Sequence, residues 1–118
     1  MKILIVDDST VNNIMLENIL TGYGHEAHSV IDSKNVLETI HSYQPDVILL
    51  DIMMPGFSGF DILKQMKQQD ISIPTIILSA YTSEDYAKQA LDLGAIEYFS
   101  KPFNQKKLIQ TIENSATT

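Results

Sequence analysis

The chain contains no cysteine and no tryptophan, and its 8 Lys and Arg residues are outnumbered by 15 Asp and Glu residues. The absence of cysteine excludes disulfides, thiolate nucleophiles and cysteine zinc sites, and it suits a reducing cytosol. The formal net charge of −7 argues against nucleic-acid binding by this domain, because phosphate contacts need clustered Lys and Arg. The first apolar run, Ile3 to Val6, is far too short for a signal peptide or a membrane span. We therefore expect a soluble, cytoplasmic protein that does not enter a membrane.

A length of 118 residues and a hydrophobic content of 44% predict one globular domain. A domain of this size buries roughly two-thirds of the surface of its unfolded chain, which is enough for a core. No linker, repeat or low-complexity segment interrupts the sequence. The predicted domain spans residues 1–118, and its polar end, residues 115–118, is either a frayed terminus or the beginning of a linker.

Short apolar runs alternate with longer segments of helical periodicity, and five such pairs follow one another along the chain. Continuous apolar runs are typical of strands that are covered on both faces. Alternation of strands and helices gives a parallel sheet with right-handed crossovers and helices on both faces. The sequence therefore predicts an α/β fold of the (βα)5 type, a three-layer sandwich. The predicted strands are Ile3–Val6, Ala27–Ile31 (the weakest), Val47–Leu50, Thr75–Leu78 and Ile96–Phe99.

Each predicted helix carries one apolar stripe that should face the sheet. Ser58 and Asp61 resemble a capping box at the start of the third helix, with Phe57 and Ile62 at the positions of a hydrophobic staple. Gly94 is suited to end the fourth helix. The stripes consist of Leu16, Ile19, Leu20 and Tyr23; Val36, Ile40 and Tyr43; Leu63 and Met66; Ala87, Ala90 and Leu91; and Leu108, Ile109 and Ile112.

Polar residues of complementary charge follow four of the five predicted strands. In open α/β sheets, ligands bind outside the carboxyl ends of the strands. Taken singly, an Asp or Ser there is more often a helix cap, an Asp-Asp pair a solvated turn, and a Lys an exposed charge. Together, three carboxylates, a hydroxyl and an ammonium group at one edge predict a single site. These residues are Asp7 and Asp8, Asp51, Ser79, and Lys101 followed by Pro102.

The expected chemistry of this edge is phosphoryl transfer. Carboxylates about 4 Å apart repel by roughly 4 kcal/mol at an effective dielectric constant near 20, so a divalent cation should compensate them. All-oxygen ligands favour Mg²⁺, or Mn²⁺, over zinc. Asp51, which follows the central run, is the predicted nucleophile that forms an acyl phosphate, with Asp7 and Asp8 holding the metal. We expect Ser79 and Lys101 to contact the phosphoryl oxygens.

These residues resemble the motifs of the receiver domain of two-component response regulators. Val6–Ser9 is similar to the acidic pair of that family, and Asp51–Gly59 (DIMMPGFSG) is similar to its phosphoacceptor segment. Ser79-Ala80 and Lys101-Pro102 resemble its hydroxyl and lysine motifs. The resemblance covers nearly the whole chain, from residue 2 to about residue 114. It implies a flavodoxin-like sheet in the strand order 2-1-3-4-5.

The resemblance also implies a function. The domain would receive a phosphoryl group on Asp51 from a sensor histidine kinase or a phosphotransfer protein, in the presence of Mg²⁺. It would be a signalling domain that assists its own phosphorylation and dephosphorylation, not an enzyme in the usual sense. The backbone carbonyl of Met53 would join Asp7, Asp8 and Asp51 as a metal ligand, and the Lys101–Pro102 bond would be cis.

The resemblance further implies a switch. Ser79 and Tyr98 would move on phosphorylation and change the face formed by the last two helices and the strand between them. That face would bind a downstream protein or an effector domain, and phosphorylation would promote a homodimer. Tyr98 as simple strand packing is the alternative. Because neither Met53 nor Tyr81 is an acid or an amide able to orient an attacking water, we expect the acyl phosphate to hydrolyse slowly.

Three other functions were weighed: a phosphatase with an aspartyl-phosphate intermediate, a flavin-binding electron carrier, and a receiver-like docking module that works without phosphorylation. A haloacid-dehalogenase-like phosphatase should have Asp-x-Asp after the first strand, and a flavodoxin should have a hydroxyl-rich phosphate loop there. The segment Gly22–Ala27 fits G-x-G-x-x-A, but it follows a helix and precedes a strand, the reverse of what dinucleotide binding needs. His25, His28 and His41 are expected on the surface and not in a metal site.

Overall fold

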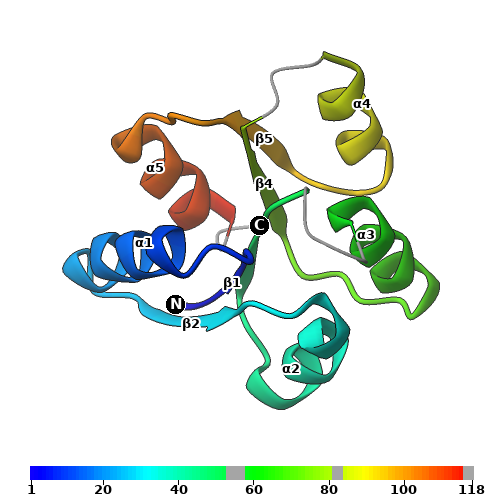
Figure 1. Ribbon diagram of the computed structural model, residues 1–118, viewed down its shortest axis with the longest axis horizontal. Helices are drawn as coiled ribbons and strands as arrows, with labels where there is room; N and C mark the ends of the chain where they lie inside the picture. Colours follow the sequence, from blue (N-terminus) through cyan, green and yellow to red (C-terminus); the bar gives the residue numbers. More distant parts are fainter. Residues whose placement is uncertain (53–57, 81–83, 116–118) are drawn as a thin grey trace.

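A five-stranded parallel β-sheet forms the centre of the molecule (Figure 1). The computed structural model describes residues 1–52, 58–80 and 84–115. Within them, the strand order is β2-β1-β3-β4-β5, which confirms the predicted flavodoxin-like α/β topology. The strands are β1 (Lys2–Val6), β2 (Glu26–Val30), β3 (Val47–Leu50), β4 (Thr75–Ser79) and β5 (Glu97–Ser100).

Five α-helices cover the two faces of this sheet and complete a three-layer sandwich (Figure 1). α1 and α5 pack on one face, and α2, α3 and α4 pack on the other. Each face has its own apolar core, because alternate side chains of a strand point to opposite sides. The helices are α1 (Thr10–Gly22), α2 (Val36–Tyr43), α3 (Gly59–Gln68), α4 (Glu84–Asp92) and α5 (Gln105–Ser115), and a 3-10 turn, η1 (Ser33–Asn35), precedes α2.

The strands β1, β3 and β4 are buried on both faces, whereas the edge strands β2 and β5 are partly exposed. This difference explains two errors in the predicted boundaries. Ile31 was expected in β2 and Ile96 in β5, yet both lie outside the strands and are 59% and 44% exposed. An edge strand has only one neighbour, so an apolar residue beside it need not be covered.

The predicted helix stripes are confirmed except at two residues. Tyr23 lies one position beyond the end of α1 and is 45% exposed, because the chain leaves the helix before the stripe can continue. Leu91 is 48% exposed, while its neighbour Ala90 is fully buried. Successive helical residues are about 100° apart around the axis. On α4 the small residue of this pair faces the sheet and the large one faces outward.

The predicted helix ends are confirmed where the structure describes them. The Ser58 hydroxyl accepts a hydrogen bond from the Asp61 N–H and the Asp61 carboxylate accepts one from the Ser58 N–H, which completes the capping box. Phe57, the expected staple residue, lies outside the described residues. Gly94 follows α4 with a φ of +107°, a conformation that glycine adopts without strain.

The turn between α1 and β2 leads from a helix into a strand, so it cannot serve the dinucleotide motif. His28 and His41 are exposed, as expected. The surface prediction is wrong for His25, whose side chain is only 8% exposed, with Nε2 3.2 Å from Glu113 Oε2. The chain folds the α1–β2 turn against α5, a contact between segments 88 residues apart. No helix in the described ranges combines the length and apolarity that a membrane crossing requires.

Candidate phosphoryl-accepting site

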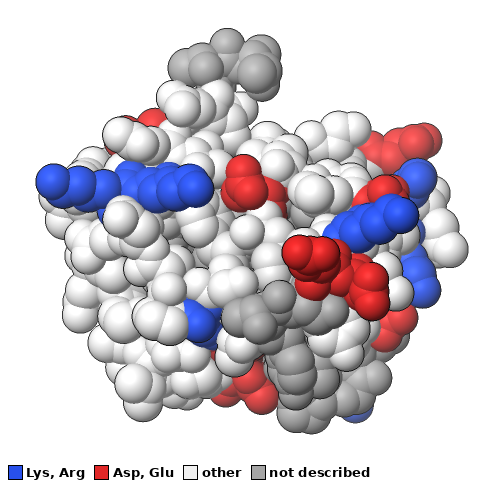
Figure 2. Space-filling model, turned by 90° about the horizontal axis from the view of Figure 1, so that it is seen from above, with Lys and Arg blue, Asp and Glu red and all other residues white. Residues whose placement is uncertain are grey.

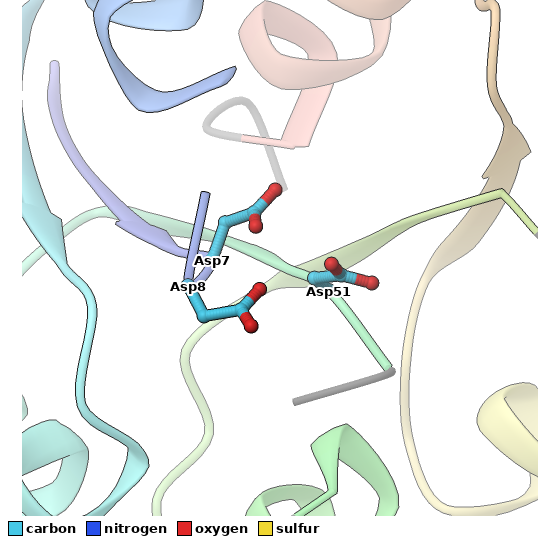
Figure 3. A group of neighbouring side chains, drawn as sticks. All are labelled: Asp7, Asp8 and Asp51. Atoms are coloured by element: carbon cyan, nitrogen blue, oxygen red, sulfur yellow. The ribbon is translucent and has the colours of Figure 1, made fainter. Parts of the chain in front are cut away.

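Three carboxylates converge at the carboxyl ends of the two central strands β1 and β3. Asp7 and Asp8 follow β1 directly, and Asp51 follows β3. The ladder between these strands extends to the site, since the Asp51 N–H donates to the Val6 carbonyl at 2.9 Å. One oxygen from each of the three carboxylates lies within 4.8 Å of the others. Figure 3 shows Asp7 and Asp8 leaving the end of β1 on the side where Asp51 lies.

The three carboxylates differ in how far they are exposed to solvent. Asp7 is 3% exposed, and its Oδ1 accepts a hydrogen bond from the Ser9 N–H at 2.9 Å. The Asp51 side chain is 13% exposed. Asp8 is exposed and makes no side-chain hydrogen bond to the described residues. The site therefore has a buried floor, formed by Asp7, and an open side where a ligand can enter.

Lys101 reaches the carboxylates from the turn after β5. Its Nζ lies 3.2 Å from Asp7 Oδ2 and 4.0 Å from Asp51 Oδ2, and its side chain is 22% exposed. Its N–H donates to the Ser79 carbonyl at 2.7 Å, and its peptide bond to Pro102 is cis. One ammonium group thus faces three carboxylates, which leaves negative charge in excess.

The excess charge and the donor atoms fit a hard divalent cation. Magnesium usually takes one or two carboxylates and keeps several waters, so an all-oxygen cluster with an exposed side suits it. No histidine joins this group among the described residues. Asp7, Asp8 and Asp51 could hold the ion. Met53, the fourth expected ligand, lies outside the described residues.

Ser79 and Tyr98 lie on the strands beside this cluster. Ser79 is the last residue of β4, fully buried, and opposite Ser100 of β5. Tyr98 is opposite Ile77 in the ladder and is half-buried. It packs against the apolar core on the α2, α3 and α4 side, which includes Ala90 of α4. The two residues thus lie on the neighbouring strands β4 and β5.

Two residues that shape the site were not predicted from the sequence. A Cβ at Gly59 would lie 2.7 Å from the Asp51 carbonyl oxygen and 2.8 Å from Ile52 Cα, so only glycine lets α3 begin against the Asp51 backbone. Asn13 is 3% exposed, and its Nδ2 donates to the Asp7 carbonyl at 2.9 Å. Gly59 was part of the quoted motif without a role. Asn13 gave no signal, because a polar residue in a helix is usually on the surface.

Charges elsewhere on the surface do not form a basic patch on the face that Figure 2 displays. Lys side chains lie in separate places there, with Asp and Glu side chains among them (Figure 2). With a net charge of −7 for the whole chain, this face has no continuous positive surface to replace the counterions of a nucleic acid.

The sequence matches the family of the response regulator receiver domain over residues 3–113. The chain belongs to this family. The receiver domain is a signalling domain, which decides against the phosphatase and the flavin carrier as its function and supports a role in phosphorelay signalling. The expected recognition and fold are both confirmed.

Individual relatives agree with this assignment. Sporulation initiation phosphotransferase F of Bacillus subtilis (strain 168) is 37% identical over 103 residues, which cover 87% of this chain and 83% of that protein. Response regulator SaeR of Staphylococcus aureus (strain USA300) is 38% identical over 117 residues, covering 98% of this chain and 50% of that protein. The receiver domain of Francisella response regulator 1452 superposes with a TM-score of 0.93 at 31% identity, covering 98% of this chain and 96% of that one.

The relatives differ in how much of their length this chain spans. It spans half of SaeR and 24% of the DNA-binding transcriptional regulator NtrC of Escherichia coli (strain K12). Receiver domains thus occur both in proteins of about this length and as parts of longer ones.

Proposed function

We propose that this receiver domain accepts a phosphoryl group on Asp51 from the phosphohistidine of a sensor histidine kinase or of a phosphotransfer protein. The observation that carries the proposal is the convergence of Asp7, Asp8 and Asp51 within 4.8 Å, with Lys101 Nζ 4.0 Å from Asp51 Oδ2. Asp51 is the carboxylate of this group that follows β3, the middle strand of the sheet. It is partly exposed, so an incoming phosphoryl group can reach it.

In the proposed transfer, a carboxylate oxygen of Asp51 attacks phosphorus. A P–O bond forms, the P–N bond to the donor imidazole breaks, and the imidazole leaves with the electron pair. Lys101 would pair with the transferred group, and the Ser79 hydroxyl would donate a hydrogen bond to it. A Mg²⁺ ion, or Mn²⁺, held by Asp7, Asp8 and Asp51 and by the Met53 carbonyl would neutralise charge on the phosphoryl oxygens. The domain thereby assists its own phosphorylation and, by hydrolysis, its own dephosphorylation.

A protein donor is favoured by an apolar surface at the rim of the site. Val11, Ile14 and Met15, here called the rim patch, are 77%, 52% and 45% exposed near the start of α1. A groove of about 450 Å³ continues from Met15 to Pro102 and Phe103, beside Lys101. Exposed apolar residues that lie together mark protein interaction sites. Val11 follows Asp8 by three residues, so a donor bound to the rim patch would lie near the site.

The output would follow from Ser79 and Tyr98. On phosphorylation the Ser79 hydroxyl would turn toward the phosphoryl group and Tyr98 would turn inward, changing the surface of α4, β5 and α5. Leu91 and Ile96 are exposed on this surface, at 48% and 44%, which supports contact with another protein. The partner would be a downstream protein, an effector domain or a second phosphorylated copy. A single domain over residues 1–118 and a cytoplasmic location remain predictions.

The test is to incubate the chain with acetyl phosphate and MgCl₂ and to measure its mass. We expect a gain of one phosphoryl group, which Asp51→Asn abolishes and Asp46→Asn, a change before β3 at the other end of the sheet, retains. No gain in the wild type, or an equal gain in Asp51→Asn, would falsify the assignment of Asp51. No gain together with intact partner binding would favour the phosphorylation-independent docking module. Steady turnover of a generic phosphomonoester would revive the phosphatase.

A further inference from the structure

Asp7 and Asp8 share a peptide unit whose carbonyl oxygen is held from below by a buried side chain. Asn13, on the second turn of α1, donates from Nδ2 to the Asp7 carbonyl oxygen at 2.9 Å. The sheet supplies no donor at this position, since the ladder to β3 ends with the bond from the Asp51 N–H to Val6. The Asn13 side-chain amide therefore supplies the donor that the neighbouring strand does not.

This contact constrains Asp8 more than Asp7. The Asp7 carboxylate is held independently by the Ser9 N–H and by Lys101 Nζ. Asp8 is exposed, and its carboxylate has no hydrogen-bond partner among the described residues. Because the peptide unit is planar, fixing the Asp7 carbonyl also fixes the direction of the Asp8 N–H and the place from which the Asp8 side chain leaves. The backbone is thus what aims Asp8 at the other two carboxylates.

The burial of Asn13 is costly, which speaks against a purely stabilising role. Its Oδ1 is buried and has no hydrogen-bond partner among the described residues. A buried amide oxygen without a partner destabilises the folded state, and this cost offsets much of what the bond to the Asp7 carbonyl contributes. Asn13 donates a hydrogen bond to the Asp7 carbonyl, while its own Oδ1 accepts none from the described residues.

We propose that Asn13 is a positioning residue for the metal site: it orients the Asp7–Asp8 peptide so that the Asp8 carboxylate meets those of Asp7 and Asp51. The inference rests on the proposed function, in which these carboxylates hold Mg²⁺. Residues that orient metal ligands from behind typically change metal affinity 10- to 100-fold when replaced. Asn13 should therefore influence Mg²⁺ binding far more than it influences folding.

The test is a Mg²⁺ titration of the ¹⁵N-labelled chain, followed by the amide chemical shifts, together with urea unfolding of each variant. Asn13→Leu should weaken Mg²⁺ binding about tenfold, with the urea midpoint little changed. Asn13→Ala, which only removes atoms, serves as a second variant if the leucine is not accommodated. Asn12→Leu makes the same substitution at the adjacent position and should leave the Mg²⁺ Kd unchanged. Leu20→Ala, on the same helix but far from the site, should lower stability and also leave the Kd unchanged.

A further readout separates positioning from a general structural defect. The slow phosphorylation of Asn13→Leu by acetyl phosphate should recover when Mg²⁺ is raised to saturation. A wild-type Kd in both Asn13 variants, an equal loss of affinity in Leu20→Ala, or a rate that stays low at saturating Mg²⁺ would each overturn the inference alone. A wild-type chain that binds no Mg²⁺ would overturn the proposed function with it.

Discussion

The two ends of the β-sheet differ in the balance between their acidic and basic groups. At the amino end, the Lys2 N–H donates to Asp46 Oδ2 at 2.7 Å, and Lys2 Nζ lies 5.3 Å from the centre of the Tyr43 ring. The Tyr43 hydroxyl donates to Glu26 at 2.8 Å. Burial, together with the hydrogen bond to Glu26, raises the pKa of the Tyr43 phenol, so it stays a donor at neutral pH. Each of these groups has a partner within the protein.

At the carboxyl end, the described carboxylates outnumber the ammonium group that faces them. Asp7, Asp8 and Asp51 face a single ammonium group, Lys101 Nζ. Like charges this close repel, and the folded state carries that repulsion. The arrangement at the amino ends of the strands therefore favours stability, and the arrangement at their carboxyl ends favours binding of a cation. An excess of carboxylates over ammonium groups therefore marks the binding end of the sheet.

The largest effect is expected where the carboxyl end is packed most tightly. Gly59→Ala would place a Cβ 2.7 Å from the Asp51 carbonyl oxygen. Because the obstacle is backbone, we expect the free energy of unfolding to fall by about 2 kcal/mol and phosphorylation of Asp51 to slow. Urea denaturation and the acetyl phosphate assay measure the two effects.

Gly22→Ala is the matched control at the other end of the sheet. No atom lies within 4 Å of a Cβ at Gly22, the last residue of α1. Stability should rise by about 0.5–1 kcal/mol, as for a helical Gly replaced by Ala. If Gly59→Ala is as stable as the wild type, the backbone of Asp51 is not held by this contact.

Magnesium should stabilise the carboxyl end only. A ligand at ten times its Kd stabilises the folded state by about 1.4 kcal/mol, because it binds only that state. The expected rise in Tm is a few degrees, measured by scanning calorimetry against NaCl of equal ionic strength. Asp46→Asn should keep the response and Asp8→Asn should lose most of it. A Tm that is unchanged at millimolar Mg²⁺ would argue against a preformed site.

The rim patch should affect the rate of phosphoryl transfer from protein donors and not from small-molecule donors. Ile14→Glu places a charge on a side chain that is 52% exposed, so the fold should tolerate it. We expect phosphotransfer from a histidine kinase to slow about tenfold, which corresponds to about 1.4 kcal/mol of lost binding, while the rate with acetyl phosphate stays unchanged. Tyr23→Glu, at the far end of the same helix, is the control. Equal slowing with both donors would contradict a docking role.

Removing one charge at each end should change stability with opposite signs. Asp8→Asn relieves repulsion and should raise the free energy of unfolding without Mg²⁺ by about 1 kcal/mol. Asp46→Asn weakens the bond from the Lys2 N–H and should lower it by about 1 kcal/mol. Urea denaturation of both variants at low ionic strength tests the comparison directly. The same sign in both variants would mean that the two ends do not differ in the way proposed.

The smallest effect concerns hydrolysis of the acyl phosphate. Met53 and Tyr81 lie outside the described residues, so slow hydrolysis stays a prediction from the sequence. Replacing both by polar residues should accelerate the decay of phosphorylated Asp51 several-fold, because a polar group can orient an attacking water. The decay is followed by mass after removal of acetyl phosphate. An unchanged or slower decay would remove the reason given for a long-lived phosphoryl group.

Much of the fold and of the site could be predicted from local patterns. β1, β3 and β4 appear in the sequence as apolar runs, since strands that are buried on both faces carry few polar side chains. Asp7 and Asp51 follow β1 and β3, and Lys101 follows β5. Ligands of open α/β sheets bind at these strand ends, so the sequence could predict that the three side chains lie together. Edge strands were placed less accurately, because one-sided burial tolerates an exposed Ile31 or Ile96.

The alternation of elements and the residue type at each strand end follow from the sequence alone. Which of these ends meet depends on the tertiary fold. Lys101 contacts Asp7 across 94 residues, and Glu113 contacts His25 across 88. The tertiary fold also determines that a polar Asn13 is buried and that Gly59 touches the Asp51 backbone. A hydrophobic pattern along the chain indicates which residues face the core. The contacts between distant segments depend instead on the order of the strands and the paths of the crossovers.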